Sequence, residues 1–279
     1  MNLEVLTDAA LAEIAARSRQ SVLRIGHDAG SQGAHFGPAL SLIEIMTALY
    51  GIAVRHSPTD PVNPDRDRVI LSKGHGSLAL YTVLHEYGFI DAATMATAET
   101  DGSLLPGQPI QNRELGIEFS SGSLGMGLSF GVGLALSARM MASDRKVFVV
   151  LGDGETNEGS IWEAAMSAAH FGLKHLTAIV DVNDLQSDGR TSEVMSCLLN
   201  AMWAGFGWDV LELDGHSIPE LRAALSCPAS SRPRCILANT IKGKGISFME
   251  GAPEWHHGRL TTEQFETASH EVHLGDSTQ

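Results

Sequence analysis

Asp153 and Asn183 each follow an apolar run that we interpret as a strand of a parallel sheet. The first run, KVFVVLGDG (146–154), ends in Gly-Asp-Gly, and the second, LTAIVDVND (176–184), contains Asn183 at its exit. One helix's worth of residues separates them. Ligands of open α/β sheets bind beyond the carboxyl ends of the strands, so we expect both side chains to point into one crevice. A carboxylate and an amide oxygen, with a nearby backbone carbonyl, form a hard oxygen set suited to Mg²⁺ or Ca²⁺.

Other interpretations of the glycines are weaker. Gly152-x-Gly154 would need a glycine at 157 to be a dinucleotide fingerprint, and Asn157 stands there. KGKGIS (242–247) lacks the spacing of a P-loop. An ordinary strand-to-helix turn remains an alternative for the triplet alone, and the Asn183 partner favours the metal site.

The elements that position these residues alternate between helix and strand along the chain. Apolar runs predict strands at 69–71, 146–154, 176–184, 207–213 and 234–241. Helical periodicity predicts helices at 7–27, 38–54, 122–142, 158–172, 196–205 and 217–226, and another after Gly74-His75-Gly76. The fold class is therefore α/β, a doubly wound parallel sheet with helices on both faces. We expect residues 1–279 to form one domain, with the last ten residues frayed.

Composition excludes several function classes. The net charge is −14, with 33 acidic and 19 basic residues, so nucleic acid and anionic membranes are not expected partners. The three cysteines form no Cys-x-x-Cys pair, which argues against structural zinc and indicates a reducing compartment. The acidic N-terminus resembles no signal peptide, and no apolar run approaches the ~20 residues of a membrane helix. A cytoplasmic location is the expectation.

Five segments in register resemble transketolase. Gly152-Asp153-Gly154 followed about thirty residues later by Asn183 is similar to the metal–diphosphate motif of thiamine diphosphate enzymes. The resemblance extends through DRVILSKGHGSLALYTVLHEYGF, SSGSLGMGLSFGVGLALS, EGSIWEAAMSAAHFGL and ANTIKGKGISFMEGAPEWHHG. The match runs in order from about residue 10 to about residue 260. It implies a thiamine diphosphate-binding fold, the diphosphate-binding module of the family.

The resemblance implies a role for each matching residue. Asp153, Asn183 and the backbone carbonyl of Leu185 would bind the metal. The implied cofactor-binding residues are His75, Gly122, Ser123, Leu124, Gly154, Glu158, Asn183, Lys242 and His256. The implied catalytic residues are His35, His75, His256 and Glu158, and the substrate contacts are His35, Gln108 and His257. His256 is preferred over His257 beside the cofactor because it lies fourteen residues past Lys242, and the doublet leaves the choice open. Glu158 and Glu163 correspond to glutamates near the family's subunit interface.

These types suit the chemistry. The cofactor is an electron sink for a carbanion, and histidines near it can bond sugar hydroxyls and move protons at neutral pH. Each histidine also has an ordinary structural interpretation, but His35 and His75 lie in glycine-flanked breaks, where side chains meet ligands. An acid in the first turn of a helix is favoured by the helix dipole, which is the alternative for Glu158. No motif supports a role for the remaining histidines, namely His27, His56, His85, His170, His175, His216, His270 and His273.

Two departures from the family pattern matter. Gly107-Gln108-Pro109 stands where transketolases usually have Gly-His-Pro, and glutamine can bond a hydroxyl but cannot take a proton near pH 7. The glutamate that activates the cofactor belongs to the family's pyrimidine-binding module, which this chain does not contain. The resemblance therefore implies the N-terminal subunit of a split transketolase, acting on sugars or sugar phosphates with a separately encoded partner, two copies of each. The alternatives are another thiamine diphosphate enzyme, either 1-deoxyxylulose-phosphate synthase-like or a 2-oxo acid dehydrogenase E1 subunit, and a non-catalytic cofactor-binding half-protein.

Overall fold

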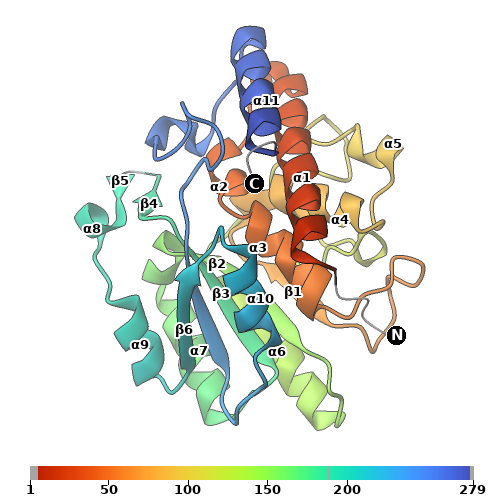
Figure 1. Cartoon of the computed structure of the whole chain (residues 1–279). Helices are drawn as coiled ribbons and strands as arrows, with labels where there is room; N and C mark the ends of the chain where they lie inside the picture. The colour runs from red at the N-terminus through yellow and green to blue at the C-terminus, as the bar shows by residue number, and fades with distance from the viewer. Residues whose placement is uncertain (1–5, 188, 277–279) are drawn as a thin grey trace.

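A five-stranded parallel sheet lies at the centre of the computed structural model, which describes residues 6–187 and 189–276 (Figure 1). The strand order across the sheet is β1-β2-β3-β7-β6, and every neighbouring pair is parallel. The strands are β1 (Arg68–Leu71), β2 (Val147–Gly152), β3 (Leu176–Val182), β6 (Asp209–Asp214) and β7 (Arg234–Asn239). A separate antiparallel pair joins β4 (Leu185–Gln186) to β5 (Gly189–Arg190).

Helices cover both faces of the sheet because successive strand residues point to opposite sides. Val147, Val149 and Leu151 pack on one face against α6 (Met126–Met140), α7 (Gly159–His170) and α9 (Leu199–Gly205). Phe148 and Val150 pack on the other face. The helices of that layer are α1 (Asp8–Asp28), α2 (Phe36–Leu40), α3 (Ile43–Ala48), α4 (Ser77–Glu86), α10 (Ile218–Ser226) and α11 (Thr262–Asp276). The predicted α/β class and parallel sheet are confirmed.

Short elements fill the connections between these layers. The short α-helices are α5 (Ala92–Met95) and α8 (Thr191–Val194). Single helical turns occur at η1 (Gly30–Gln32), η2 (Leu49–Ala53), η3 (Gly74–Gly76), η4 (Arg113–Leu115), η5 (Gly154–Asn157) and η6 (Pro253–His256). In the described part of the chain, no helix combines the length and apolar character needed to cross a membrane.

The carboxyl ends of β3 and β7 meet although β6 separates these strands in the sequence. Val182 pairs with Asn239 at the last position of the register, and the Thr240 amide donates to the Val182 carbonyl at 2.8 Å. The chain that leaves β3 carries Asn183, and the chain that leaves β7 carries Lys242. Crevices of this kind, where neighbouring strands lead in different directions, are where open α/β sheets bind ligands.

Two segments differ from the sequence expectation. The helix predicted at 38–54 is broken into α2, α3 and η2, because the Leu42 amide bonds to Ala39 and the Ser41 hydroxyl lies 3.2 Å from the Pro38 carbonyl. The β4–β5 pair and α8 follow β3 without a periodic signal in the sequence. α11 is helical to Asp276, and residues 277–279 lie outside the described part, so the frayed tail expected over the last ten residues stays a prediction.

Candidate active site

Asp153 lies at the carboxyl end of β2, buried, with its carboxylate turned towards the exit of β3. Oδ1 accepts the Gly154 amide at 2.8 Å, and Oδ2 accepts the amides of Asn183 at 3.0 Å and Asp184 at 2.7 Å. Burial, together with the negative charge of Asp181, raises the pKa of Asp153 to about 6. The carboxylate therefore fixes the path of the chain that leaves β3 and keeps a site where positive charge is favoured.

Asn183 and Leu185 present the other two predicted metal-binding oxygens. Asn183 Oδ1 accepts the Leu185 amide at 3.2 Å, and its amide group donates to Asp181 Oδ2 at 3.1 Å, which orients the oxygen. The backbone between them turns through Asp184, whose φ of 61° lies in the left-handed region. The Leu185 carbonyl accepts from Lys242 Nζ at 3.4 Å.

A buried ion pair supports this crevice from below. Lys73 is 1% exposed and donates to Asp181, which is fully buried. Asp181 also accepts from the hydroxyls of Ser41, at 2.7 Å, and Thr240. Burial alone would raise the pKa of Asp181, but the charge of Lys73 and these hydrogen bonds hold it below its ordinary value. Asp181 thus remains ionised and ties β3 to α2 and to the chain after β7.

Lys242 enters the crevice from the chain after β7. The turn needs glycine at 243, which has a φ of 82° and whose Cβ would collide with the Met249 carbonyl. Lys242 is buried, and its ammonium lies 3.1 Å from His256 Nδ1. Burial and the charge of Lys73 lower the pKa of Lys242 to about 8, against the opposite effects of Asp153 and Asp181.

Four histidines form a wall beside Lys242. The ring centroid of His35 lies 6.2 Å from that of His75, 5.6 Å from that of His256 and 4.6 Å from that of His257. The rings of His75 and His256 are 5.2 Å apart. An isolated bridge between Ala34 and Gly258, with amide–carbonyl distances of 2.8 and 3.0 Å, holds the two histidine-bearing segments together.

Burial and neighbouring positive charges make two of these rings, His35 and His75, weaker bases than an ordinary histidine. Burial, followed by the charges of His257, His256 and Lys242, lowers the pKa of His35 to about 4. Burial and the charge of Lys73 lower the pKa of His75 to about 2. Both are therefore neutral at pH 7, and each can accept a hydrogen bond from a group that approaches its unprotonated nitrogen.

Gln108 packs directly on the turn that carries His75. A Cβ on Gly74 would collide with Gln108 Oε1 and would lie 2.6 Å from Ser121 Oγ. Gln108 Oε1 and Ser121 Oγ are both buried without a hydrogen-bond partner in the described structure. A hydroxyl group placed at this edge of the histidine wall could form hydrogen bonds with these two unsatisfied polar atoms.

The remaining predicted residues lie around the mouth of the crevice. Leu124 lines it beside Gly154, whereas Gly122 and Ser123 are exposed. Glu158 is exposed at the start of α7, and a Cβ on Gly125 would lie 2.7 Å from its Cβ. Glu163 is also exposed on α7. Neither glutamate reaches the cavity beneath the histidines.

Two cavities share Asp153. The smaller, of about 90 Å³, is lined by 14 residues that include Lys73, His75, Gly154, Asn183, Leu185, Lys242 and His256. His256 lines it and His257 does not, which supports His256 as the cofactor-side member of the doublet. Among residues 6–187 and 189–276, no three His, Cys, Asp or Glu side chains are grouped to hold a metal ion. The predicted oxygen set has only one carboxylate, that of Asp153, and its other members are an amide and a backbone carbonyl.

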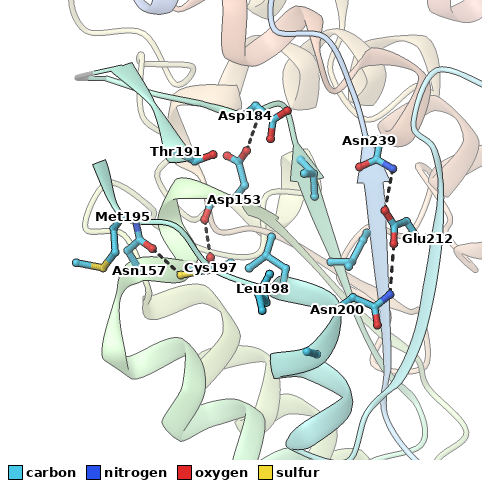
Figure 2. A pocket seen from close by; sticks show the side chains of 15 residues that line it. Asp153, Asn157, Asp184, Thr191, Met195, Cys197, Leu198, Asn200, Glu212 and Asn239 are labelled. Atoms are coloured by element: carbon cyan, nitrogen blue, oxygen red, sulfur yellow. Dashed lines mark hydrogen bonds between the residues drawn. The ribbon is translucent and has the colours of Figure 1, made fainter. Parts of the chain in front are cut away.

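The larger cavity, of about 450 Å³, lies on the other side of Asp153 under α8 and α9 (Figure 2). Its acid Glu212 already accepts from Asn200 and Asn239, each at 3.3 Å, and Cys197 donates to Asn157 at 3.3 Å. Among the described residues that line it, none is a lysine, an arginine or a histidine. A diphosphate therefore fits the smaller cavity better, because that cavity holds the cationic and neutral nitrogen donors.

Several charged residues of the site were not predicted from the sequence. These are Lys73, Asp181 and Glu155, of which Glu155 accepts from Ser72 and from the amides of Gly125 and Gly152. Asp181 carried a usable signal, because it is an acid in an otherwise apolar strand and lies on the same side as Asn183, two residues later. The contacts of Lys73 with Asp181 and of Glu155 with Ser72 and Gly125 cross long sequence separations, which no local pattern encodes.

Comparison with known proteins agrees with this geometry. The family described as transketolase, thiamine diphosphate binding domain, matches residues 15–276. The chain is 42% identical over 259 residues to one subunit of an apulose-4-phosphate transketolase of Phocaeicola vulgatus, covering 92% of this chain and 91% of that protein. It is 41% identical over 241 residues to a 6-deoxy-6-sulfo-D-fructose transketolase subunit, SqwG, of Clostridium sp., covering 85% of this chain and 88% of that protein.

A solved structure gives the same fold. Transketolase from Campylobacter jejuni superposes with a TM-score of 0.85 at 27% identity, over 98% of this chain and 43% of that one. The chain therefore spans nearly the full length of the Phocaeicola vulgatus relative and less than half of the solved transketolase. The chain belongs to the transketolase family, as its thiamine diphosphate-binding domain.

Proposed function

We propose that the chain is the diphosphate-binding subunit of a two-chain transketolase, which transfers a two-carbon ketol unit from a ketose to an aldose. One observation carries the proposal: the oxygens of Asp153, Asn183 and Leu185 face the same small cavity as Lys242, His75 and His256. Oxygen ligands next to cationic or neutral nitrogen donors suit a metal-bound diphosphate. The match in length to a relative that is itself named as one transketolase subunit supports the division into two chains.

The three oxygens have capacity left for a divalent metal, Mg²⁺ or Ca²⁺. A carboxylate has about four acceptor sites, and Asp153 uses three of them on backbone amides. Asn183 Oδ1 and the Leu185 carbonyl oxygen each have two acceptor sites, and each uses one of them for a hydrogen bond within the protein. The donor set therefore fits a hard cation, which would leave the rest of its coordination sphere to phosphate oxygens and water.

The nitrogen donors and Gly154 fit the diphosphate. Lys242 lies beside the Leu185 carbonyl and contacts His256, and His75 lines the same cavity. A Cβ on Gly154 would lie 2.9 Å from Gln186 Cγ, so glycine lets the Gln186 side chain pack directly on the backbone at this edge of the cavity. A cavity of about 90 Å³ is far below the ~300 Å³ of sites that enclose a cofactor-sized ligand. The remainder of the cofactor would lie against other surfaces, among them Gly122, Ser123, Leu124 and Glu158.

The histidine wall fits the sugar. Bound thiamine diphosphate would supply the electron sink for the two-carbon fragment. His35, His75, His256 and His257 would orient the sugar hydroxyls. The low pKa values of His35 and His75 keep these two rings neutral, so that each can accept a hydrogen bond from a hydroxyl group. Gln108 would bond a hydroxyl without taking its proton. The names of the relatives refer to an apulose phosphate and a sulfonated fructose, which supports an anionic sugar as the substrate class.

The partner would be a separately encoded pyrimidine-module subunit, with two copies of each chain. Two exposed apolar side chains, Met126 on α6 at 49% and Met166 on α7 at 50%, support an interface on these neighbouring helices. The positions of Glu158, at the start of α7, and Glu163, on α7, are those that the family resemblance places near the subunit interface. Residues 1–279 would act as one domain built on one sheet. The free cysteines Cys197, Cys227 and Cys235 support the cytoplasm as the compartment.

The test is reconstitution. The purified chain alone should bind the cofactor weakly and show no ketol transfer. When it is mixed with a pyrimidine-module subunit, it should bind the cofactor tightly and catalyse ketol transfer. The measurements are ketol transfer from a panel of phosphorylated and sulfonated ketoses, and the mass by light scattering. Full transketolase activity of the isolated chain would refute the two-chain proposal.

A further inference from the structure

His216 lies outside the histidine wall and bonds to the backbone just before Lys242. It follows β6 in an Asp214-Gly215-His216 turn, where a Cβ on Gly215 would lie 2.5 Å from Thr240 Cγ2. Glycine therefore lets this turn press against the chain after β7. His216 Nε2 then lies 2.9 Å from the Ile241 amide nitrogen.

The two ring nitrogens of His216 have opposite roles. Nε2 faces an N–H group, so it must be the acceptor and carries no proton. Nδ1 must then carry the proton, and it lies 2.9 Å from Glu44 Oε2, to which it donates. The structure therefore fixes the Nδ1–H tautomer of a neutral imidazole, as a carboxylate commonly does for a histidine that uses its other nitrogen.

Glu44 is in turn fixed by Arg19. Arg19 NH2 lies 2.5 Å from Glu44 Oε1, and the side chains of Arg19, Glu44 and His216 are each only 11% exposed. Burial alone would raise the pKa of Glu44, but the charge of Arg19 and the His216 hydrogen bond lower it to about 2. The carboxylate is therefore ionised throughout the physiological range and always accepts from both partners.

The same network forms hydrogen bonds to the backbone before and after Lys242. His216 holds the amide of Ile241, one residue before Lys242, and Arg19 Nε donates to the carbonyl of Lys244, two residues after it, at 3.1 Å. Arg19 comes from α1, Glu44 from α3 and His216 from the turn before α10, three elements that lie together on one face of the sheet (Figure 1). None of the three side chains lines the small cavity.

We propose that His216, oriented by Glu44 and Arg19, is a positioning residue that sets the backbone of residues 241–244 and thereby the Lys242 ammonium in the cofactor cavity. The inference rests on the proposed function, because it takes Lys242 as a diphosphate-binding group. The network of Arg19, Glu44 and His216 would then contribute to cofactor affinity through the position of Lys242. It does not contribute to the geometry of the four histidines of the wall.

The first arm of the test needs no cofactor. Nitrogen NMR of the full chain labelled at histidine should show the Nδ1–H tautomer for His216, and the Ile241 amide should exchange slowly with solvent. An Nε2–H tautomer, a doubly protonated ring, or a rapidly exchanging Ile241 amide in the wild-type chain would overturn the network.

The second arm compares two substitutions that keep different halves of the imidazole. His216→Gln can place an acceptor near the Nε2 position, whereas His216→Asn keeps only the group that faces Glu44. His216→Asn should weaken binding of thiamine diphosphate with Mg²⁺ about tenfold, the effect of one lost hydrogen bond to the Ile241 amide, and should speed exchange at Ile241. His216→Gln should stay within about twofold of the wild type. His170→Asn, an exposed histidine at the end of α7, is the control and should change neither.

The outcomes separate the inference from the proposed function. Equal loss of affinity in the Gln and Asn variants, or unchanged affinity in both, would overturn the positioning role of Nε2. If wild-type chain titrated with thiamine diphosphate and Mg²⁺ showed no chemical-shift change at all, the proposed function and the link to Lys242 would both fail. The tautomer and the Ile241 exchange rate would still decide whether the hydrogen-bond network exists.

Discussion

Removing the charge of Asp181 tests whether a buried ion pair supports the site. Asp181→Asn keeps the shape of the side chain and one of its two oxygens, which can still accept from Ser41 or from Thr240 but not from both. It leaves the Lys73 ammonium without its counter-charge. Lys73 is 1% exposed, so solvent cannot replace the lost carboxylate. The perturbation is therefore the loss of a partner for a buried charge, with little change in packing.

The expected magnitude follows from that burial. Breaking a buried pair by removing one partner costs about 3–5 kcal/mol of unfolding free energy. For a chain of 279 residues, the entropy of unfolding is about 0.6 kcal/mol/K, so the unfolding midpoint should fall by about 5–9 °C. Lys73→Met should cost a similar amount. The double variant should cost much less than the sum of the two, because neither charge is then left alone.

Urea unfolding followed by tryptophan fluorescence is a suitable assay, since Trp203 and Trp208 are buried in the core on the α6–α7 face. Asp209→Asn is a matched control, because Asp209 pairs at 2.6 Å with an Arg232 side chain that is 59% exposed. That variant should lose less than about 1 kcal/mol. If Asp181→Asn lost no more than the control, or if the effects of Lys73→Met and Asp181→Asn simply added, the buried pair would not be supporting the site.

Three further substitutions test separate features of the molecule. Asp153→Ala should weaken metal-dependent binding of thiamine diphosphate by about 100-fold or more, because a charged ligand of the metal is lost; calorimetry that gave unchanged affinity would reject the metal assignment. Gln108→His should change the ranking of sugar substrates in the reconstituted enzyme and leave cofactor affinity alone, and identical substrate profiles would put Gln108 outside the sugar channel. Burial raises the pKa of Glu99 from 4.5 to about 7, so the folded chain retains a proton that the unfolded chain has released, and stability falls as pH rises through that range. Glu99→Gln should therefore raise the free energy of unfolding by on the order of 1 kcal/mol over wild type at pH 8, after allowance for the partial exposure of the carboxyl, and should not change it at pH 4. If the variant and the wild type had the same unfolding midpoint as each other at pH 8 as well as at pH 4, the raised pKa would be contradicted.

The sheet could be predicted from the sequence because its strands are fully covered. Val147–Gly152 and Leu176–Val182 are nearly continuous apolar runs, which occur when helices bury both faces. Asp153 and Asn183 could be placed at one edge for the same reason. The broken helix at 38–54 was not anticipated. Its break is local, at the bond between the Ser41 hydroxyl and the Pro38 carbonyl, but the same hydroxyl also bonds to Asp181, 140 positions away in the sequence, and no local pattern encodes that contact.

The site was predictable where glycine marks it. His75 and Lys242 are next to glycines that the packing requires, Gly74 and Gly243, and both residues were assigned from motifs. His216 follows Gly215 in the same way, yet it was left without a role because its partners, Glu44 and Ile241, are 172 and 25 residues away. Long-range partners of this kind are set by tertiary packing, which the spacing of residues in one sequence does not reveal.

The central claim is that this chain binds a metal that carries the cofactor's diphosphate. A crystal structure of the chain with thiamine diphosphate and Mn²⁺, in which the anomalous signal locates the metal, tests it most directly. We predict one strong peak about 2.0–2.4 Å from a carboxylate oxygen of Asp153, Asn183 Oδ1 and the Leu185 carbonyl, with the diphosphate between that peak and Lys242. A peak in the larger cavity beside Glu212, or a diphosphate bound away from Lys242 and His256, would contradict it.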